Sequence, residues 1–108
     1  MNDDAVIVVA TITPKEGQED AVESALREAV RGVHLEEGCL RYALHRTLDD
    51  PARFVMIEKW ESAAALDAHS RAAALAELGG RLKGMLAGPT DVVRLTALPD
   101  GDSVLGRL

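Results

Sequence analysis

The most constraining feature of the sequence is a set of short strand-like segments that are apolar on both of their alternating faces. Residues 5–12 read Ala-Val-Ile-Val-Val-Ala-Thr-Ile and are rich in the β-branched residues that favour strands. Alternate side chains of a strand point to opposite faces, so this segment has no face suited to water. Residues 53–60 and 91–98 are also apolar at both parities. We therefore expect a sheet that is covered on both sides.

A helical segment separates the first two strand segments. Between residues 18 and 33 the apolar side chains recur three or four positions apart, which is the spacing of a helix with one buried stripe. Residues 39–46 then alternate between two faces, as a strand does. Residues 49–51 read Asp-Asp-Pro and predict a hairpin turn that leads into residues 53–60.

A second helical region is predicted after Ser62, a residue type that favours the N-cap position. Glycine is a poor helix former, so Gly79-Gly80 is expected to break this region into two pieces. Its buried stripe is expected to be formed by four leucines, Leu75, Leu78, Leu82 and Leu86. Residues 91–98 then supply the last strand.

This order of elements is the split βαβ pattern. It predicts an α+β, ferredoxin-like βαββαβ fold in which helices cover one face of a four-stranded antiparallel sheet. The domain is expected to span residues 1–98, and residues 99–108 to form a C-terminal tail that packs on the partner subunit. Since the helices cover only one face, the second apolar face predicts a homodimer closed sheet against sheet across a two-fold axis. The alternative is that a helix or the tail folds over that face.

The composition narrows the class of protein. The 108 residues fit one domain, and the net charge of −6 comes without a cluster of Lys and Arg, which argues against nucleic acid and anionic membranes as partners. The single cysteine excludes an internal disulfide and favours a reducing compartment. The apolar run at residues 5–10 is too short for a signal core or a membrane span. These features predict a cytoplasmic protein.

Four segments of the chain read Gly38-Cys39-Leu40-Arg41-Tyr42, Glu58-Lys59-Trp60-Glu61-Ser62, Ala65-Leu66-Asp67-Ala68-His69 and Leu86-Ala87-Gly88-Pro89. In their order and spacing these motifs resemble the antibiotic biosynthesis monooxygenase family. The resemblance runs from the first strand to about Leu98 and implies a dimeric α+β barrel. That family includes cofactor-free oxygenases of anthrones and quinols, haem-degrading enzymes and an isomerase of a phosphorylated signalling sugar, so the fold leaves the activity open.

His69 is the predicted catalytic residue. Helical spacing puts it on the same face as Leu66, turned toward the sheet. Free imidazole titrates with a pKa of about 6.5, so a neutral histidine in a dry pocket is suited to take a proton from a phenol or hydroquinone. The family resemblance also points to this histidine. The alternative is a half-buried structural histidine bonded to a carbonyl group.

Aromatic and apolar residues are predicted to form the wall of a substrate pocket near His69. Trp60 shares a strand face with Met56, and the flat indole is suited to an aromatic ligand. Tyr42 lies between Leu40 and Leu44 on the predicted inner face, where its hydroxyl would orient a ligand oxygen. Core packing is the alternative role for both aromatic residues. The predicted substrate-binding residues are Trp60, Tyr42, Leu66, Met56 and Leu40.

No cofactor is predicted. The three histidines and the single cysteine do not stand at metal-ligand spacing, and no glycine-rich nucleotide motif is present. Haem-degrading relatives carry an asparagine in the first strand, whereas residues 5–12 contain none. Many relatives also carry Thr-Pro-His-Phe after the matched histidine, where this chain reads Ala72-Ala73-Ala74-Leu75.

Three functions are consistent with these features. The first is a cofactor-independent monooxygenase that oxidises a small hydroxylated aromatic of quinol or anthrone type with molecular oxygen. The second is a non-oxidative isomerase of a small carbonyl compound, in which His69 moves a proton. The third is a non-catalytic domain that binds an aromatic metabolite.

Overall fold

The predicted βαββαβ order is confirmed in the computed structural model, which describes residues 4–108. Residues 1–3, the start of the predicted domain, lie outside the described residues. The elements in chain order are β1 (Val6–Ile12), α1 (Glu19–Val33), β2 (Cys39–Arg46), β3 (Phe54–Trp60), α2 (Ala63–Ser70), α3 (Ala73–Leu82) and β4 (Asp91–Leu95).

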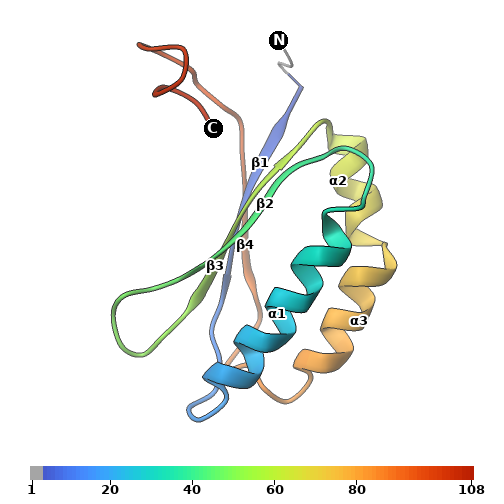
Figure 1. Cartoon of the computed structure of the whole chain (residues 1–108), viewed down its shortest axis with the longest axis vertical. Helices are drawn as coiled ribbons and strands as arrows, with labels where there is room; N and C mark the ends of the chain where they lie inside the picture. The colour runs from blue at the N-terminus through green and yellow to red at the C-terminus, as the bar shows by residue number, and fades with distance from the viewer. Residues whose placement is uncertain (1–3) are drawn as a thin grey trace.

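The four strands form one antiparallel sheet in the order β2-β3-β1-β4, and all three helices lie on the same side of it (Figure 1). The last strand ends at Leu95, whereas the sequence predicted it to continue to residue 98. Its pairing with β1 ends at Ile7↔Leu95, and β1 begins at Val6. The residues after Leu95 therefore have almost no part of β1 left with which to form hydrogen bonds. The fold is therefore the ferredoxin-like α+β arrangement.

The second helical region is divided, but not at Gly79-Gly80. Both glycines lie inside α3, and the break falls at Arg71 and Ala72. The N–H groups of these two residues donate to Ala68 O and His69 O, and Ala72 then turns extended with φ −79° and ψ 159°. A glycine costs a helix only about 1 kcal/mol, and burial of Leu78 and Leu82 outweighs that cost.

The core between helices and sheet has two parts. One part lies under α2 and is built around Trp60 and Met56, with Val8 and Leu66 packed beside them. The other lies between α1 and α3 and holds the remaining large side chains, Ile12, Val22, Leu26, Phe54, Leu78 and Leu82. Ser62 caps α2 as predicted, since its Oγ accepts a hydrogen bond from Ala65 N–H.

A bulge at the start of β2 changes which side chains face the helices. Cys39 pairs with Trp60 and Arg41 pairs with Lys59, so Leu40 is an extra residue without a partner. The prediction that Leu40 shares the inner face with Tyr42 is therefore wrong. Cys39 packs toward the core instead, and Leu40 is 40% exposed.

Gly38 joins the loop before β2 closely to α2. Its φ of +82° lies in the left-handed region, and a Cβ atom there would stand 2.5 Å from Ala65 Cβ. Its carbonyl also accepts a hydrogen bond from Glu61 N–H at 2.8 Å. Only glycine satisfies both the backbone conformation and the close approach, and this contact holds α2 beside the end of α1.

Comparing Gly38→Ala with Gly17→Ala separates the cost of the positive φ from the cost of the close approach to Ala65. Gly17 also has a positive φ, +87°, but an added Cβ would meet nothing within 4 Å. We expect Gly17→Ala to lower the free energy of unfolding by about 1 kcal/mol through backbone strain. Gly38→Ala should cost about 1–3 kcal/mol more through the clash with Ala65. Urea unfolding of both variants measures the difference, and equal losses would contradict a close packing role for Gly38.

Candidate active site

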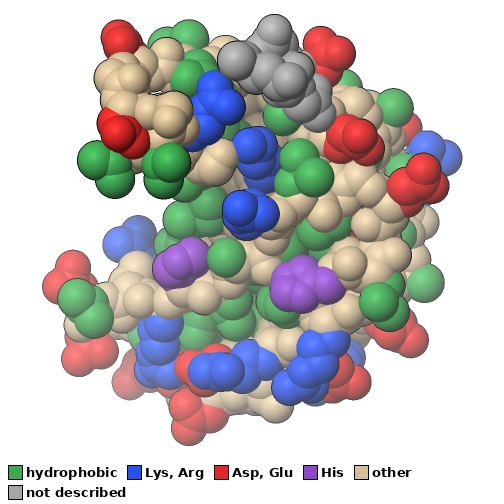
Figure 2. Space-filling view, turned by 45° about the horizontal axis from the view of Figure 1, so that its top comes forward, with side chains coloured by type: hydrophobic (Ala, Val, Ile, Leu, Met, Phe, Trp, Pro, Cys, Tyr) green, Lys and Arg blue, Asp and Glu red, His purple; other side chains and the backbone are tan. Residues whose placement is uncertain are grey.

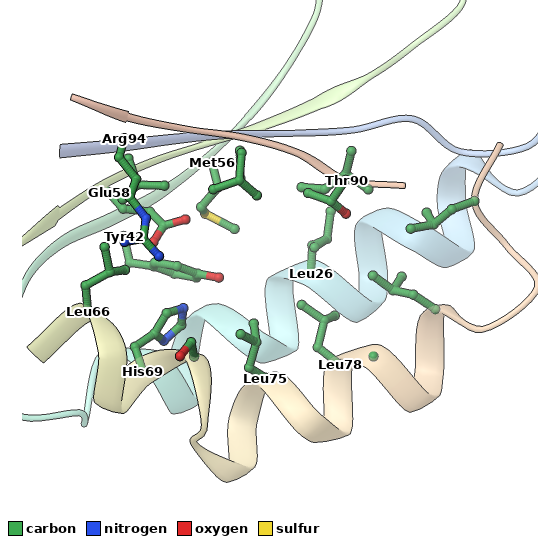
Figure 3. A pocket seen from close by; sticks show the side chains of 18 of the residues that line it. Leu26, Tyr42, Met56, Glu58, Leu66, His69, Leu75, Leu78, Thr90 and Arg94 are labelled. Atoms are coloured by element: carbon green, nitrogen blue, oxygen red, sulfur yellow. The ribbon is translucent and has the colours of Figure 1, made fainter. Parts of the chain in front are cut away.

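A cavity of about 590 Å³ lies between the sheet and the helices. Its volume is within the range of roughly 300–1,000 Å³ that small-molecule sites occupy. Figure 3 shows that its two ends differ: Leu26, Leu75 and Leu78 line one end, while Tyr42, Glu58, His69 and Arg94 gather at the other. A ligand in this cavity would therefore meet a mostly apolar wall, with titratable groups gathered at one end and the hydroxyl of Thr90 at the other.

His69 stands at the polar end, on the last turn of α2, and is only 5% exposed. Its ring stacks on Trp60 with centroids 4.4 Å apart, and the edge of Tyr42 approaches it at 5.5 Å. Its Nδ1 lies 2.8 Å from Glu36 Oε1, in the turn that follows α1. The imidazole is thus fixed on several sides by contacts that hold its orientation.

Glu58 projects from β3 into the same end of the cavity and is 5% exposed. Its Oε1 accepts a hydrogen bond from Trp60 Nε1–H at 2.9 Å. Burial raises the pKa of Glu58, and the bond from Trp60 and the attraction of His69 oppose that shift only in part. Glu58 is therefore a carboxyl group that holds its proton more tightly than an exposed glutamate does.

Tyr42 is buried on β2, and its hydroxyl points into the cavity (Figure 3). Burial is the main reason that the pKa of Tyr42 is strongly raised, and the nearby carboxylates of Glu58 and Glu36 add to the shift. The phenol accordingly keeps its proton and is suited to donate a hydrogen bond to a ligand oxygen.

The structure brings most of the predicted site residues together. Tyr42, Met56, Leu66 and His69 line the cavity. Trp60 does not: it is fully buried behind His69 and supports the imidazole rather than facing a ligand. Leu40 also lies outside the cavity, because the β2 bulge directs it elsewhere.

Several polar residues of the site were not predicted: Glu36, Glu58, Ser70, Lys83, Thr90 and Arg94. Glu58 could have been found from the sequence. Strand alternation in residues 53–60 puts its charge on the same face as the apolar side chains of Phe54, Met56 and Trp60. Arg94 could have been found in the same way, because alternate side chains of a strand point to opposite faces. In β4, Val93 faces away from the helices, and Arg94 lines the cavity. Glu36 had no signal, because its contact with His69 joins residues 33 positions apart.

Within residues 4–108, no group of three His, Cys, Asp or Glu side chains is placed to hold a metal ion. None of the helices in that part of the chain is long and apolar enough to cross a bilayer. The polar end of the cavity combines a buried imidazole, a buried carboxyl group and a phenol, which is a set of groups suited to proton transfer to and from a small molecule.

The chain is thus a ferredoxin-like domain with a cavity between its sheet and its helices, and titratable side chains gather at one end of that cavity. The family model of antibiotic biosynthesis monooxygenases matches residues 5–78. The chain belongs to the antibiotic biosynthesis monooxygenase family, as the motifs in its sequence suggested.

Individual relatives agree with this assignment. The Bacillus subtilis protein named "Putative monooxygenase YcnE" is 30% identical over 89 residues, which cover 82% of this chain and 94% of that protein. The crystal structure of PA3566 from Pseudomonas aeruginosa is 31% identical, with a TM-score of 0.83 over 91% of this chain and 98% of the other. Rv0793 from Mycobacterium tuberculosis shares the fold, with a TM-score of 0.82 at 24% identity, over 91% and 99% of the two chains.

The raised pKa of Glu58 predicts how stability changes with pH. A glutamate in the unfolded chain titrates near 4.5, so the stability that Glu58 contributes is fully present below that pH. It is lost as the pH rises through the higher pKa of the folded state, because ionisation is unfavourable in the buried site. In Glu58→Gln the side chain cannot ionise, yet its amide oxygen can still accept the Trp60 N–H.

We therefore expect the stability of Glu58→Gln, relative to the unsubstituted chain, to improve as the pH rises above about 4.5 and to level off once the pH has passed the raised pKa of Glu58 in the folded state. Urea unfolding at one-unit intervals measures this trend. Glu16→Gln, at an exposed position, provides the matched control and should show no such trend. A relative stability of Glu58→Gln that is flat or falls with pH would contradict the burial of the carboxylate.

Proposed function

We propose that this protein is a cofactor-independent monooxygenase that oxidises a small hydroxylated aromatic compound, of quinol or anthrone type, with molecular oxygen. The observation that carries the proposal is the buried imidazole of His69 at the polar end of a mostly apolar cavity of about 590 Å³. Membership of the family supports oxygenase chemistry, and the apolar wall supports a flat aromatic substrate.

The cavity residues supply the first step of such a reaction. The substrate lies with its ring against Leu66 and Met56 and its oxygen at the polar end. His69 accepts a proton from the ring hydroxyl or from the acidic CH2 of an anthrone. The hydroxyl of Tyr42 donates a hydrogen bond to the substrate oxygen and stabilises the negative charge that develops there.

The anion then serves as its own reductant, so the reaction needs no other electron donor. One electron passes from the anion to O2, which gives superoxide and a substrate radical. These two combine through a new C–O bond to form a peroxide, which takes a proton. Cleavage of the O–O bond with loss of the second C–H proton releases water and leaves a carbonyl group. For an anthrone, CH2 and O2 thus become C=O and H2O.

Replacing His69 tests this proposal directly. We expect metal-free protein to consume oxygen with a panel of hydroquinones and anthrones, measured with an oxygen electrode against the uncatalysed rate. His69→Ala and His69→Gln should lower kcat by about 100-fold or more, because general-base catalysis contributes roughly that much. The control is His34→Gln, since His34 bonds to the Tyr42 carbonyl oxygen outside the cavity lining.

The same assay under nitrogen separates the competing functions. Conversion of a carbonyl substrate without oxygen would indicate a non-oxidative isomerase, for which a proton-shuttling His69 also suffices. Quenching of Trp60 fluorescence by an aromatic ligand that is never converted would indicate a binding domain. Unchanged oxygen consumption by His69→Ala would contradict the assignment of the base.

We also propose that two copies associate through the side of the sheet that the helices leave uncovered, here termed the open face. Strand register assigns to it the side chains of Ile7, Val9, Thr11, Arg41, Ala43, His45, Val55, Ile57, Lys59, Asp91, Val93 and Leu95. Most of these are apolar, and Leu95 is 43% exposed. A contiguous apolar surface of this kind is typical of an interface.

The shape of the open face supports this association. Figure 2 shows a hollow with hydrophobic side chains in it, bordered by the C-terminal tail above and the β2–β3 hairpin below. The tail stands on the side of the sheet away from the helices (Figure 1). It exposes Val104 and Leu105, while Lys59 Nζ donates to Leu108 O at 2.7 Å. Residues 99–108 are therefore suited to pack on the partner subunit.

A charge on the open face should weaken the dimer. By sedimentation equilibrium, we expect the protein to have twice the mass of the 11.5-kDa chain, and Leu95→Glu to raise the dimer Kd at least about tenfold, or 1.4 kcal/mol. Leu48→Glu places the same charge on a fully exposed leucine of the β2–β3 turn and should leave the Kd unchanged. A monomeric protein at micromolar concentration would contradict the proposed assembly.

A further inference from the structure

Glu36 lies outside the cavity but touches the residue on which the proposed chemistry depends. It follows α1 in a turn, where its N–H donates to Val33 O, and its side chain reaches across to α2. Glu36 Oε1 is 2.8 Å from His69 Nδ1. Its other oxygen, Oε2, is buried and has no hydrogen-bond partner within residues 4–108.

This contact bears on which ring nitrogen of His69 carries a proton. An ionised carboxylate can only accept hydrogen bonds, so with Glu36 in that form the proton between the two side chains belongs to His69 Nδ1. A neutral imidazole has one N–H, and the lone pair is therefore on Nε2. A histidine held in this way has a proton acceptor at the ring atom opposite the carboxylate.

We propose that Glu36 is a positioning residue that acts through His69: it holds the Nδ1–H tautomer, and its negative charge stabilises the imidazolium formed when Nε2 takes a proton from the substrate. This inference rests on the proposed role of His69 as the base. Glu36 is not a catalytic residue, because it does not line the cavity.

The unpartnered Oε2 supports this role over a purely structural one. A buried acceptor without a partner is unfavourable to folding, and an apolar side chain would fill the same space without that penalty. A carboxylate at this position is useful when a positive charge appears on the imidazole beside it. The negative charge is then paired at the step of the reaction that needs it.

Two substitutions separate the charge of Glu36 from its hydrogen bond. Glu36→Gln keeps an acceptor oxygen and nearly the same shape but removes the charge. Glu36→Leu removes both. Glu37→Gln is the matched control, since it makes the same change at the next residue, which is exposed. Thermal unfolding of each variant verifies that it is folded under the assay conditions.

With an aromatic substrate that the protein oxidises, we expect Glu36→Gln to lower kcat by about 10–100-fold and to leave KM within about twofold, since it acts on the base and not on substrate contacts. Glu36→Leu should lower kcat at least as far, and Glu37→Gln should leave both constants unchanged. A kcat for Glu36→Gln and Glu36→Leu within twofold of the unsubstituted protein would overturn the inference.

The tautomer provides a readout that does not depend on turnover. In 15N NMR spectra of the resting protein, we expect the His69 signals of the Nδ1–H form, retained in Glu36→Gln and lost in Glu36→Leu. An Nε2–H form in the unsubstituted protein, or an unchanged tautomer in Glu36→Leu, would overturn the inference even if the protein oxidises aromatics. If no aromatic is oxidised, the proposed function fails while this spectrum still decides whether Glu36 positions His69.

Discussion

The polar end of the cavity depends on the burial of Trp60. The indole ring supports the imidazole of His69 by stacking, meets the edge of Tyr42, and donates its only N–H to Glu58. One fully buried side chain thereby orients three functional groups that come from β2, β3 and α2. Because an aromatic ring has few rotatable bonds, this arrangement is held with little loss of freedom beyond that of the core itself.

Much of the fold followed from local patterns in the sequence. Apolar residues at both parities identified β1 and β3, the spacing of α1 matched its buried stripe, and Ser62 marked the start of α2. Besides the early end of β4, two predictions failed for local reasons that no simple period describes. A bulge at Leu40 shifted the parity of one strand residue, and helix α3 continued through two glycines because its leucines are buried.

The site was predictable only where a residue's own element determined its direction. Helical spacing turned His69 toward the sheet, and strand alternation put Tyr42 and Met56 on the inner face. The Glu36–His69 contact depends on how closely the end of α1 approaches α2, which is a tertiary distance set by Gly38. The sequence also did not reveal that Trp60 lies behind His69 and not in the cavity wall. Strand alternation gives the face on which a side chain lies but not how deeply it is buried.

The edge strand β4 is the part of the cavity wall with the fewest partners. It contributes Val92 and Arg94 to the wall, yet it pairs only with β1 and all five of its residues are exposed. A short ladder with a single neighbour opens locally at a much lower free energy than the central strands do. β4 is therefore the least firmly held part of the cavity wall, whereas Trp60 and the groups around it are buried in the core.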